Sequence, residues 1–191
     1  MDSGNFPANG IDKIIEGAGI GFEAAEPHAR IGTTFYTNAP GGFPSDYIAS
    51  HDGPEFIWFD MGSDVALSEI SYWGYSDTNA NGLRQFRLSF ATGAEAGTAT
   101  LGDELYSSSI SLTPEFSAVQ SMIPRQSFTF DEVTARFVRL EAISTFFEQP
   151  GAGAGGDRLG IGEIAFAQPI PEASTGLLAL ISVGFLLRRR R

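Results

Sequence analysis

The sequence predicts an all-β protein built as an antiparallel sandwich, and three observations predict this class. Polar and apolar residues alternate in short segments between residues 56 and 166. Clusters of turn-forming residues separate these segments. Glycine is abundant, with 23 of 191 residues, as expected where many turns join short strands.

The clearest strand signal is Gln85–Phe90, where alternation is unbroken and one face is therefore expected to be buried. Phe56–Phe59 is apolar on both faces, which predicts a central strand. Further strands are expected at Leu67–Tyr75, Ser109–Leu112, Ser127–Phe130, Arg136–Leu140 and Ile164–Phe166. Turns are expected at Met61–Asp64, Asn79–Gly82 and Gly93–Gly97, and a helix only near Asn9–Glu16.

The charge distribution indicates which classes of molecule the protein is not expected to bind. The chain has 12 basic and 23 acidic residues, but four arginines end it, so residues 1–170 hold 8 basic and 22 acidic residues and carry a net charge of −14. A body this acidic repels phosphate backbones, which argues against nucleic-acid binding. The chain contains no cysteine, which excludes disulfides, thiolate metal sites and cysteine nucleophiles.

The C-terminal segment has the pattern of a membrane helix. Residues 175–187 contain no charge, and Arg188, Arg189, Arg190 and Arg191 follow them. This order predicts a helix with a cytoplasmic stop and places the body outside the cytoplasm. Thirteen residues span only about 20 Å of a core about 30 Å thick, so the anchor is marginal. The predicted organisation is a β-sandwich at 1–167, a linker at 168–174, and the helix with its arginines at 175–191. A core helix with a basic end is the alternative.

This tail resembles the PEP-CTERM sorting signal of bacterial surface proteins. Pro171 and Glu172 begin a short motif that precedes the apolar helix and the arginine cluster, although Ala173 stands where the second proline is usual. The resemblance implies export by a Gram-negative bacterium and recognition by an exosortase, a membrane peptidase. The chain would be anchored in the inner membrane as a precursor and then reach the cell surface or extracellular matrix.

The N-terminus lacks the features of an export signal. The first seven residues, MDSGNFP, have no basic start, no apolar core and no small-residue cleavage site. We therefore expect that the true start lies upstream of Met1.

A second resemblance covers about residues 5–167. The segments PEFIWFDMG at 54–62, RFVRL at 136–140 and GIGEI at 160–164 are similar, in order and spacing, to the discoidin or F5/8 type C domain. NGID at 9–12 is similar to the opening motif of that family, although Lys13 replaces a glycine. The resemblance implies a galactose-binding-like jelly roll.

The same resemblance implies a structural calcium site, because the opening aspartate and the glutamate of the closing strand approach each other in that family. Their matches here are Asp12 and Glu163, and Thr33 or Thr34 would add a hydroxyl oxygen. Calcium binds carboxylate and other oxygen ligands. The alternative is that Asp12 caps a turn and that Glu163 is solvated or pairs with Arg158.

We expect Asp60 and Arg139 to have a structural role. Asp60 precedes a glycine turn, where its carboxylate is expected to accept backbone N–H bonds. Arg136 and Arg139 are three apart and should point to opposite faces of a strand, so that Arg139 reaches an acidic partner such as Asp60.

No enzyme motif stands out. The sequence has no Gly-x-Ser-x-Gly, His-Glu-x-x-His or P-loop pattern. The pair His51–Asp52 lies in a Gly- and Pro-rich segment typical of a turn. Binding is therefore the expected function. Sugars stack on aromatic rings and bond to polar side chains, and the candidate ligand residues are His51, Tyr75, Asn79 and Arg84.

Two classes of function follow. The first is a non-catalytic carbohydrate-binding or adhesive module that acts in the extracellular polysaccharide. The second is a structural matrix protein without a specific ligand, or an accessory fragment of a secreted polysaccharide-active enzyme.

Overall fold

The computed structural model describes residues 10–15, 28–29, 34–75, 80–97, 108–114, 122–123 and 125–167. In this part of the chain most of the ordered structure is strand. The strands are β1 (His28–Ala29), β2 (Phe35–Tyr36), β3 (Glu55–Gly74), β4 (Leu83–Ala91), β5 (Ser108–Leu112), β6 (Met122–Ile123), β7 (Arg125–Thr145) and β8 (Gly160–Ala167). The helices are the 3-10 turn η2 (Ile11–Ile14) and the single-turn helices α1 (Tyr47–Ser50) and α2 (Gly93–Ala96).

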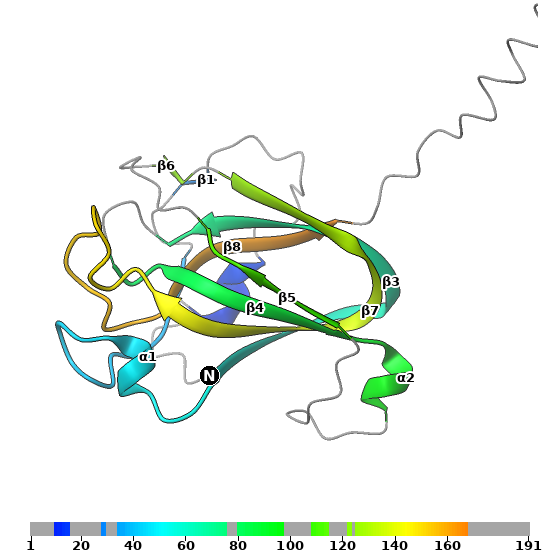
Figure 1. Ribbon diagram of the computed structural model, residues 1–191, viewed down its shortest axis with the longest axis horizontal. Coiled ribbons are helices and arrows are strands. Elements are labelled where there is room, and N and C mark those ends of the chain that lie inside the picture. The colour runs from blue at the N-terminus through cyan, green and yellow to red at the C-terminus, as the bar shows by residue number, and fades with distance from the viewer. Residues whose placement is uncertain are drawn as a thin grey trace, which may run out of the picture.

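The sandwich is one hydrogen-bonded sheet that bends into two layers (Figure 1). Its strand order is β2-β8-β3-β7-β4-β5, and every pair is antiparallel. The first half of β3 pairs with the second half of β7, which continues through β4 to β5. The second half of β3 lies between β8 and the first half of β7. Two long strands therefore belong to both layers, and β1 and β6 form a separate small sheet.

The bend replaces a turn that the sequence predicts. Met61–Asp64 is expected to end one strand, but β3 runs through it with a shift of register between Asp60 and Val65. Gly62 takes a φ of +81°, and its N–H donates to Asp60 Oδ1 at 2.8 Å. This local turn inserts extra residues into the strand without ending it, as a bulge does. The prediction of two strands was therefore wrong here, and Ser127–Phe130 and Arg136–Leu140 are likewise one strand, β7.

An ion pair between Arg136 and Asp60 stabilises the bend. Arg136 donates to both oxygens of Asp60, from Nε at 2.9 Å and from Nη2 at 3.0 Å. Arg139, the predicted partner of Asp60, instead lies opposite Trp58 in the ladder. Its guanidinium lies 4.6 Å from the ring centroid of Phe56 and 5.9 Å from that of Trp58. The register shift brings Arg136 to Asp60, which the simple alternation of a strand does not reveal.

The Asp60 ion pair predicts a pH effect on stability. The Arg136 hydrogen bonds, followed by the Gly62 N–H, lower the pKa of Asp60 from 3.8 to about 2. Because the pKa is lower in the folded state, this contribution is present above about pH 4 and is lost as the pH falls towards 2. We expect Asp60→Asn to lose less melting temperature than the wild type between pH 4 and pH 2, measured by circular dichroism. Parallel melting curves across that window would contradict the assignment.

The predicted alternation in β4 is confirmed. Phe86, Leu88 and Phe90 are fully buried and Arg87 is exposed, but Ser89, on the same face as Arg87, is also buried. Tyr72 of β3 lies against Phe86 with ring centroids 5.7 Å apart, and its hydroxyl donates to the Leu83 carbonyl at 2.9 Å. The core between the two layers is thus apolar, and its buried tyrosine hydroxyl is satisfied.

The predicted sorting segment lies outside the described residues. This applies to Pro171, Glu172, the helix at 175–191 and Arg188 to Arg191, and to the N-terminal residues before Gly10. Among the residues that the structure does describe, no helix has both the length and the apolar character needed to span a membrane.

Candidate functional site

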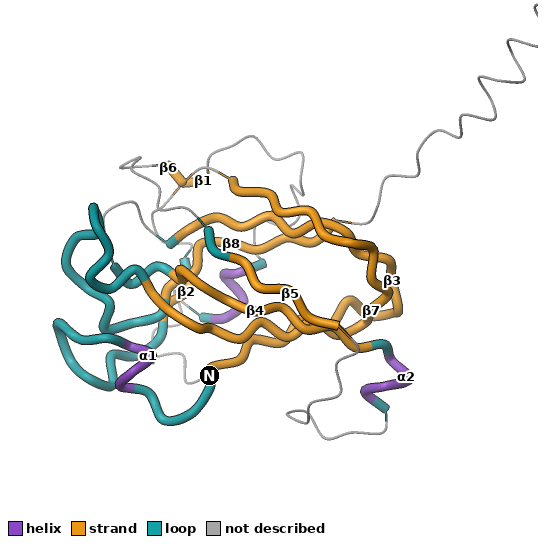
Figure 2. The backbone as a smooth tube through the Cα atoms, viewed as in Figure 1, coloured by secondary structure: helices purple, strands orange, loops and turns teal. Residues whose placement is uncertain are grey.

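Most of the described loops gather at the end of the sandwich that carries α1, opposite the bend of β3 and β7 (Figure 2). Three segments meet there: 37–46 after β2, 80–82 before β4, and 146–159 between β7 and β8. They are far apart in sequence, and buried polar groups connect them.

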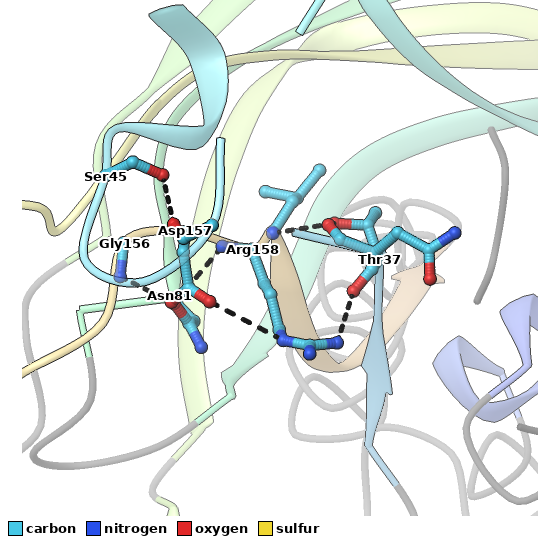
Figure 3. Close-up of polar contacts among 9 residues, drawn as sticks. Thr37, Ser45, Asn81, Gly156, Asp157 and Arg158 are labelled. Carbon is cyan, nitrogen blue, oxygen red and sulfur yellow. Dashed lines mark hydrogen bonds and ion pairs between the residues drawn. The ribbon is translucent and has the colours of Figure 1, made fainter. Parts of the chain in front are cut away.

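Asn81 is the centre of these connections (Figure 3). Its side chain is buried, and Oδ1 accepts from the N–H of Gly156 at 2.6 Å and from the N–H of Arg158 at 3.3 Å. Its carbonyl accepts from the N–H of Gly160 at 2.8 Å. One asparagine therefore fixes the path of the 156–160 segment as it enters β8.

The 156–159 segment in turn holds two other pieces of chain. The Thr37 N–H donates to the Leu159 carbonyl at 3.0 Å, and Thr37 Oγ1 accepts from the Leu159 N–H at 3.0 Å. Arg158 Nη1 donates to the Thr37 carbonyl at 3.0 Å (Figure 3). The Gly156 carbonyl accepts from the N–H of Tyr47 at 2.7 Å. The same loop thus positions both the chain after β2 and the start of α1.

These two positioned segments form the walls of a pocket of about 300 Å³. Its lining residues are Asn38, Pro40, Tyr47, His51 and Glu55. The first two follow β2, the next two belong to α1 and its C-cap, and the last begins β3. Asp46 caps α1 by accepting from the N–H groups of Ile48 and Ala49, which fixes where the helix begins.

Glu55 is the polar centre of the pocket. It has the same parity in β3 as the buried Ile57 and Phe59, so it faces the interior, and it is only 4% exposed. Its Oε1 accepts from the hydroxyl of Tyr47 at 2.8 Å and faces His51 Nε2 at 2.5 Å. No described residue donates a hydrogen bond to its other oxygen, Oε2. This carboxylate oxygen thus remains available to a molecule in the pocket.

Tyr47 of α1 and His51, its C-cap, pack around this carboxylate. The rings of Tyr47 and His51 stack with centroids 5.5 Å apart. Burial, with a further contribution from Glu55, raises the pKa of Tyr47 above its ordinary value, so its hydroxyl stays a neutral donor. The other ring nitrogen of His51, Nδ1, lies 3.3 Å from the Gly53 carbonyl.

The structure brings three predicted ligand residues to this end of the sandwich. His51 lines the pocket, whereas Tyr75 and Arg84 do not. Tyr75 packs edge-on against Tyr36 at 6.2 Å, and a Cβ added to Gly160 would lie 2.5 Å from its ring. Arg84 lies near the start of β4 and makes no hydrogen bond or ion pair with a described residue. Asn79 lies outside the described residues.

The sequence analysis missed Tyr47, Glu55 and Asn38. Glu55 is four residues after His51, but both stand in a Gly- and Pro-rich segment where the sequence gives no helical or strand periodicity. The available signal was a glutamate placed directly before the apolar segment Phe56–Phe59.

The predicted calcium ligands are placed as follows. Asp12 lies on η2, its side chain is 71% exposed, and its Oδ2 is 3.9 Å from Lys13 Nζ. Glu163 lies on β8 and is buried, so the alternative of a solvated glutamate was wrong. Arg158 pairs with Asp157 at 3.8 Å and not with Glu163. Thr33 lies outside the described residues, among which no group of three or more histidine, aspartate or glutamate side chains could hold a metal.

Comparison with known proteins identifies the fold. No family model matches the sequence, and no curated protein matches it. A similar solved structure is the C-terminal domain of a chitobiase from Bacteroides fragilis, with 18% identity, 87% of this chain and 86% of that chain covered, and a TM-score of 0.53. The chain shares the fold of that domain. The prediction of an all-β antiparallel sandwich is thereby confirmed.

Two further similar structures are carbohydrate-binding modules. One is the second family 32 module of a family 31 glycoside hydrolase, bound to N-acetylgalactosamine, with 12% identity, 85% and 90% coverage and a TM-score of 0.49. The other is the family 32 module of NanJ from C. perfringens in complex with galactose, with 16% identity, 70% and 75% coverage and a TM-score of 0.42.

Proposed function

We propose that the protein is a non-catalytic carbohydrate-binding module and that its ligand site is the pocket around Glu55. The observation that carries the proposal is the free Oε2 of a carboxylate that is 4% exposed and lines a pocket. A ligand hydroxyl that donates to this carboxylate oxygen would form a hydrogen bond to a charged group, which contributes about 1.5–3 kcal/mol. Sugars supply such hydroxyls in quantity.

The rest of the lining supports a small polar ligand. Asn38 is exposed at the pocket, and its side-chain amide makes no hydrogen bond with a described residue, so it offers both a donor and an acceptor. Phe43, on the same loop, is 68% exposed and presents an aromatic face to solvent. A volume of about 300 Å³ is at the lower end of the range for small-molecule sites, which favours a single sugar unit over a long chain segment.

Binding without catalysis is favoured by the number of carboxylates in the pocket. Glu55 is the single carboxylate among the described residues that line the pocket. Glycoside hydrolysis generally uses a pair of carboxyl groups that flank the bond to be cleaved. The described part of the lining thus supports recognition of a sugar and contains no such pair.

The test is a glycan array probed with the full chain, followed by calorimetric titration of the best sugar. We expect retention of a subset of glycans and weaker binding by His51→Ala, because the imidazole contacts Glu55 and lines the pocket. Glu132→Gln, an exposed position in the bend at the opposite end, serves as a control and should bind like the wild type. Retention of no glycan would overturn the proposal and favour a structural matrix protein without a specific ligand.

We propose further that the tail directs the protein to the cell surface through an exosortase. The support is the sequence pattern of residues 169–191, with Pro171, Glu172 and the four terminal arginines. A reporter fused to this segment should be exported and processed only in a strain with an active exosortase. A fusion that stays uncut inside such a strain would contradict the sorting role.

Calcium binding also remains a proposal. Glu163 on β8 and Asp12 on η2 come from elements that pack together, and such carboxylates suit calcium, although Lys13 lies beside Asp12. If calcium binds the folded state, saturation at about 100 times Kd should raise the melting temperature by about 5–10 °C over that in chelator. Asp12→Asn should remove this difference. Equal wild-type melting temperatures in calcium and chelator would contradict the site.

A further inference from the structure

The charges around the pocket point to the class of sugar that it accepts. We infer that the pocket selects neutral sugars and rejects sugars that carry a carboxylate, which deepens the proposed function and rests on it. The selecting group is Glu55, whose buried side chain contributes the negative charge among the lining residues. An ionised carboxylate only accepts hydrogen bonds, so the ligand group that meets Oε2 must donate one.

His51 is the basic residue of the lining, and both its ring nitrogens face protein acceptors. Nε2 lies 2.5 Å from Glu55 Oε1, and Nδ1 lies 3.3 Å from the Gly53 carbonyl. Whichever nitrogen carries a proton, it is directed at the protein. His51 therefore offers no N–H with which to neutralise a ligand carboxylate.

The described charged residues next to the lining also do not supply a cation that could neutralise a ligand carboxylate. Arg158 donates to the Thr37 carbonyl, lies 3.8 Å from Asp157, and covers the ring of Tyr36 at 5.2 Å. Two acidic side chains flank the lining residues of α1: Asp46 caps the helix, and Asp52 is exposed next to His51.

Arg84 is the cation that could weaken this selection. It lies at the same end of the sandwich and makes no ion pair with a described residue, but it does not line the pocket. A ligand carboxylate inside the pocket would thus meet Glu55 at short range and Arg84 only from outside the lining. Repulsion between like charges is strongest where water is excluded.

The test compares sugars that differ at one carbon, using titration of the full chain. The probes are methyl galactoside and methyl galacturonide, the corresponding glucose and glucuronic acid pair, and the methyl ester of each uronide. We expect each binding uronide to be at least about tenfold weaker than its neutral partner, equivalent to about 1.4 kcal/mol. The neutral ester should recover most of the lost affinity, because its size is retained and its charge is removed.

The outcomes separate the inference from the proposed function. A uronide that binds as tightly as its neutral partner, or an ester that stays as weak as the acid, would overturn the charge selection while leaving sugar binding intact. Absence of binding by every probe and by every arrayed glycan would overturn the proposed function itself.

Two variants, Glu55→Gln and Arg84→Gln, test which residue causes the preference for neutral over acidic sugars. Glu55→Gln should reduce the ratio of neutral to acidic affinity, measured on a multivalent array so that weak binding is visible. Arg84→Gln should leave the neutral sugar bound and keep the ratio at or above the wild-type value. An unchanged ratio in Glu55→Gln, or a uronide preference that depends on Arg84, would overturn the assignment.

Discussion

Replacing Glu55 with glutamine is expected to weaken sugar binding by about 10- to 100-fold, because a hydrogen bond to a charged group contributes about 1.5–3 kcal/mol. The amide keeps the size of the side chain but loses its charge and one of its two acceptor oxygens. Its remaining oxygen cannot serve Tyr47, His51 and the ligand together, since Oε1 alone already accepts from the first and faces the second. Isothermal titration of the full chain measures the change.

The control for Glu55→Gln is Glu132→Gln, which removes the same charge from an exposed position in the bend. It should leave the affinity within about twofold of the wild type, as expected of surface changes away from the site. Near-wild-type affinity of Glu55→Gln, in a protein whose melting curve is cooperative, would contradict the role of Oε2. A loss as large in Glu132→Gln would assign the effect to net charge.

Replacing Asn81 with alanine is expected to lower the free energy of unfolding by about 2–4 kcal/mol, because each buried donor left unsatisfied costs about 1–3 kcal/mol. Asn81 Oδ1 accepts from the N–H groups of Gly156 and Arg158, and alanine offers no acceptor to either. Urea denaturation measures the change. Since the 156–159 segment positions Thr37 and Tyr47, the variant should also lose sugar affinity.

Asn38→Ala is the matched control for the stability effect. Its side chain is exposed and makes no hydrogen bond with a described residue, so its unfolding free energy should stay within about 0.5 kcal/mol of the wild type. A loss below about 1 kcal/mol in Asn81→Ala would show that the loop holds its path without the asparagine.

The strands could be predicted from sequence because burial on one face imposes alternation. Phe86, Leu88 and Phe90 illustrate this directly. The bend could not, because Gly62 and Asp60 are typical of both a strand-ending turn and a bulge within a strand. Only the pairing of β3 with β7 on both sides of the bulge distinguishes the two.

The site was predicted in part. His51, which the sequence analysis names as a candidate sugar contact, lines the pocket, and its contact with a ligand stays a prediction. Glu55 was not, because its function depends on burial and on a neighbour in α1 that the sequence does not place. The Asn81 contacts join residues 75 and 77 positions apart, a distance at which one sequence offers no local signal.

A crystal structure of the full chain with the best sugar from the array would locate the ligand directly. We expect a sugar hydroxyl at hydrogen-bonding distance, about 2.5–3.0 Å, from Glu55 Oε2, with His51 and Asn38 beside it. A sugar bound elsewhere, for example on the outer face at Phe56 and Trp58, with the Glu55 pocket empty, would contradict the proposed site.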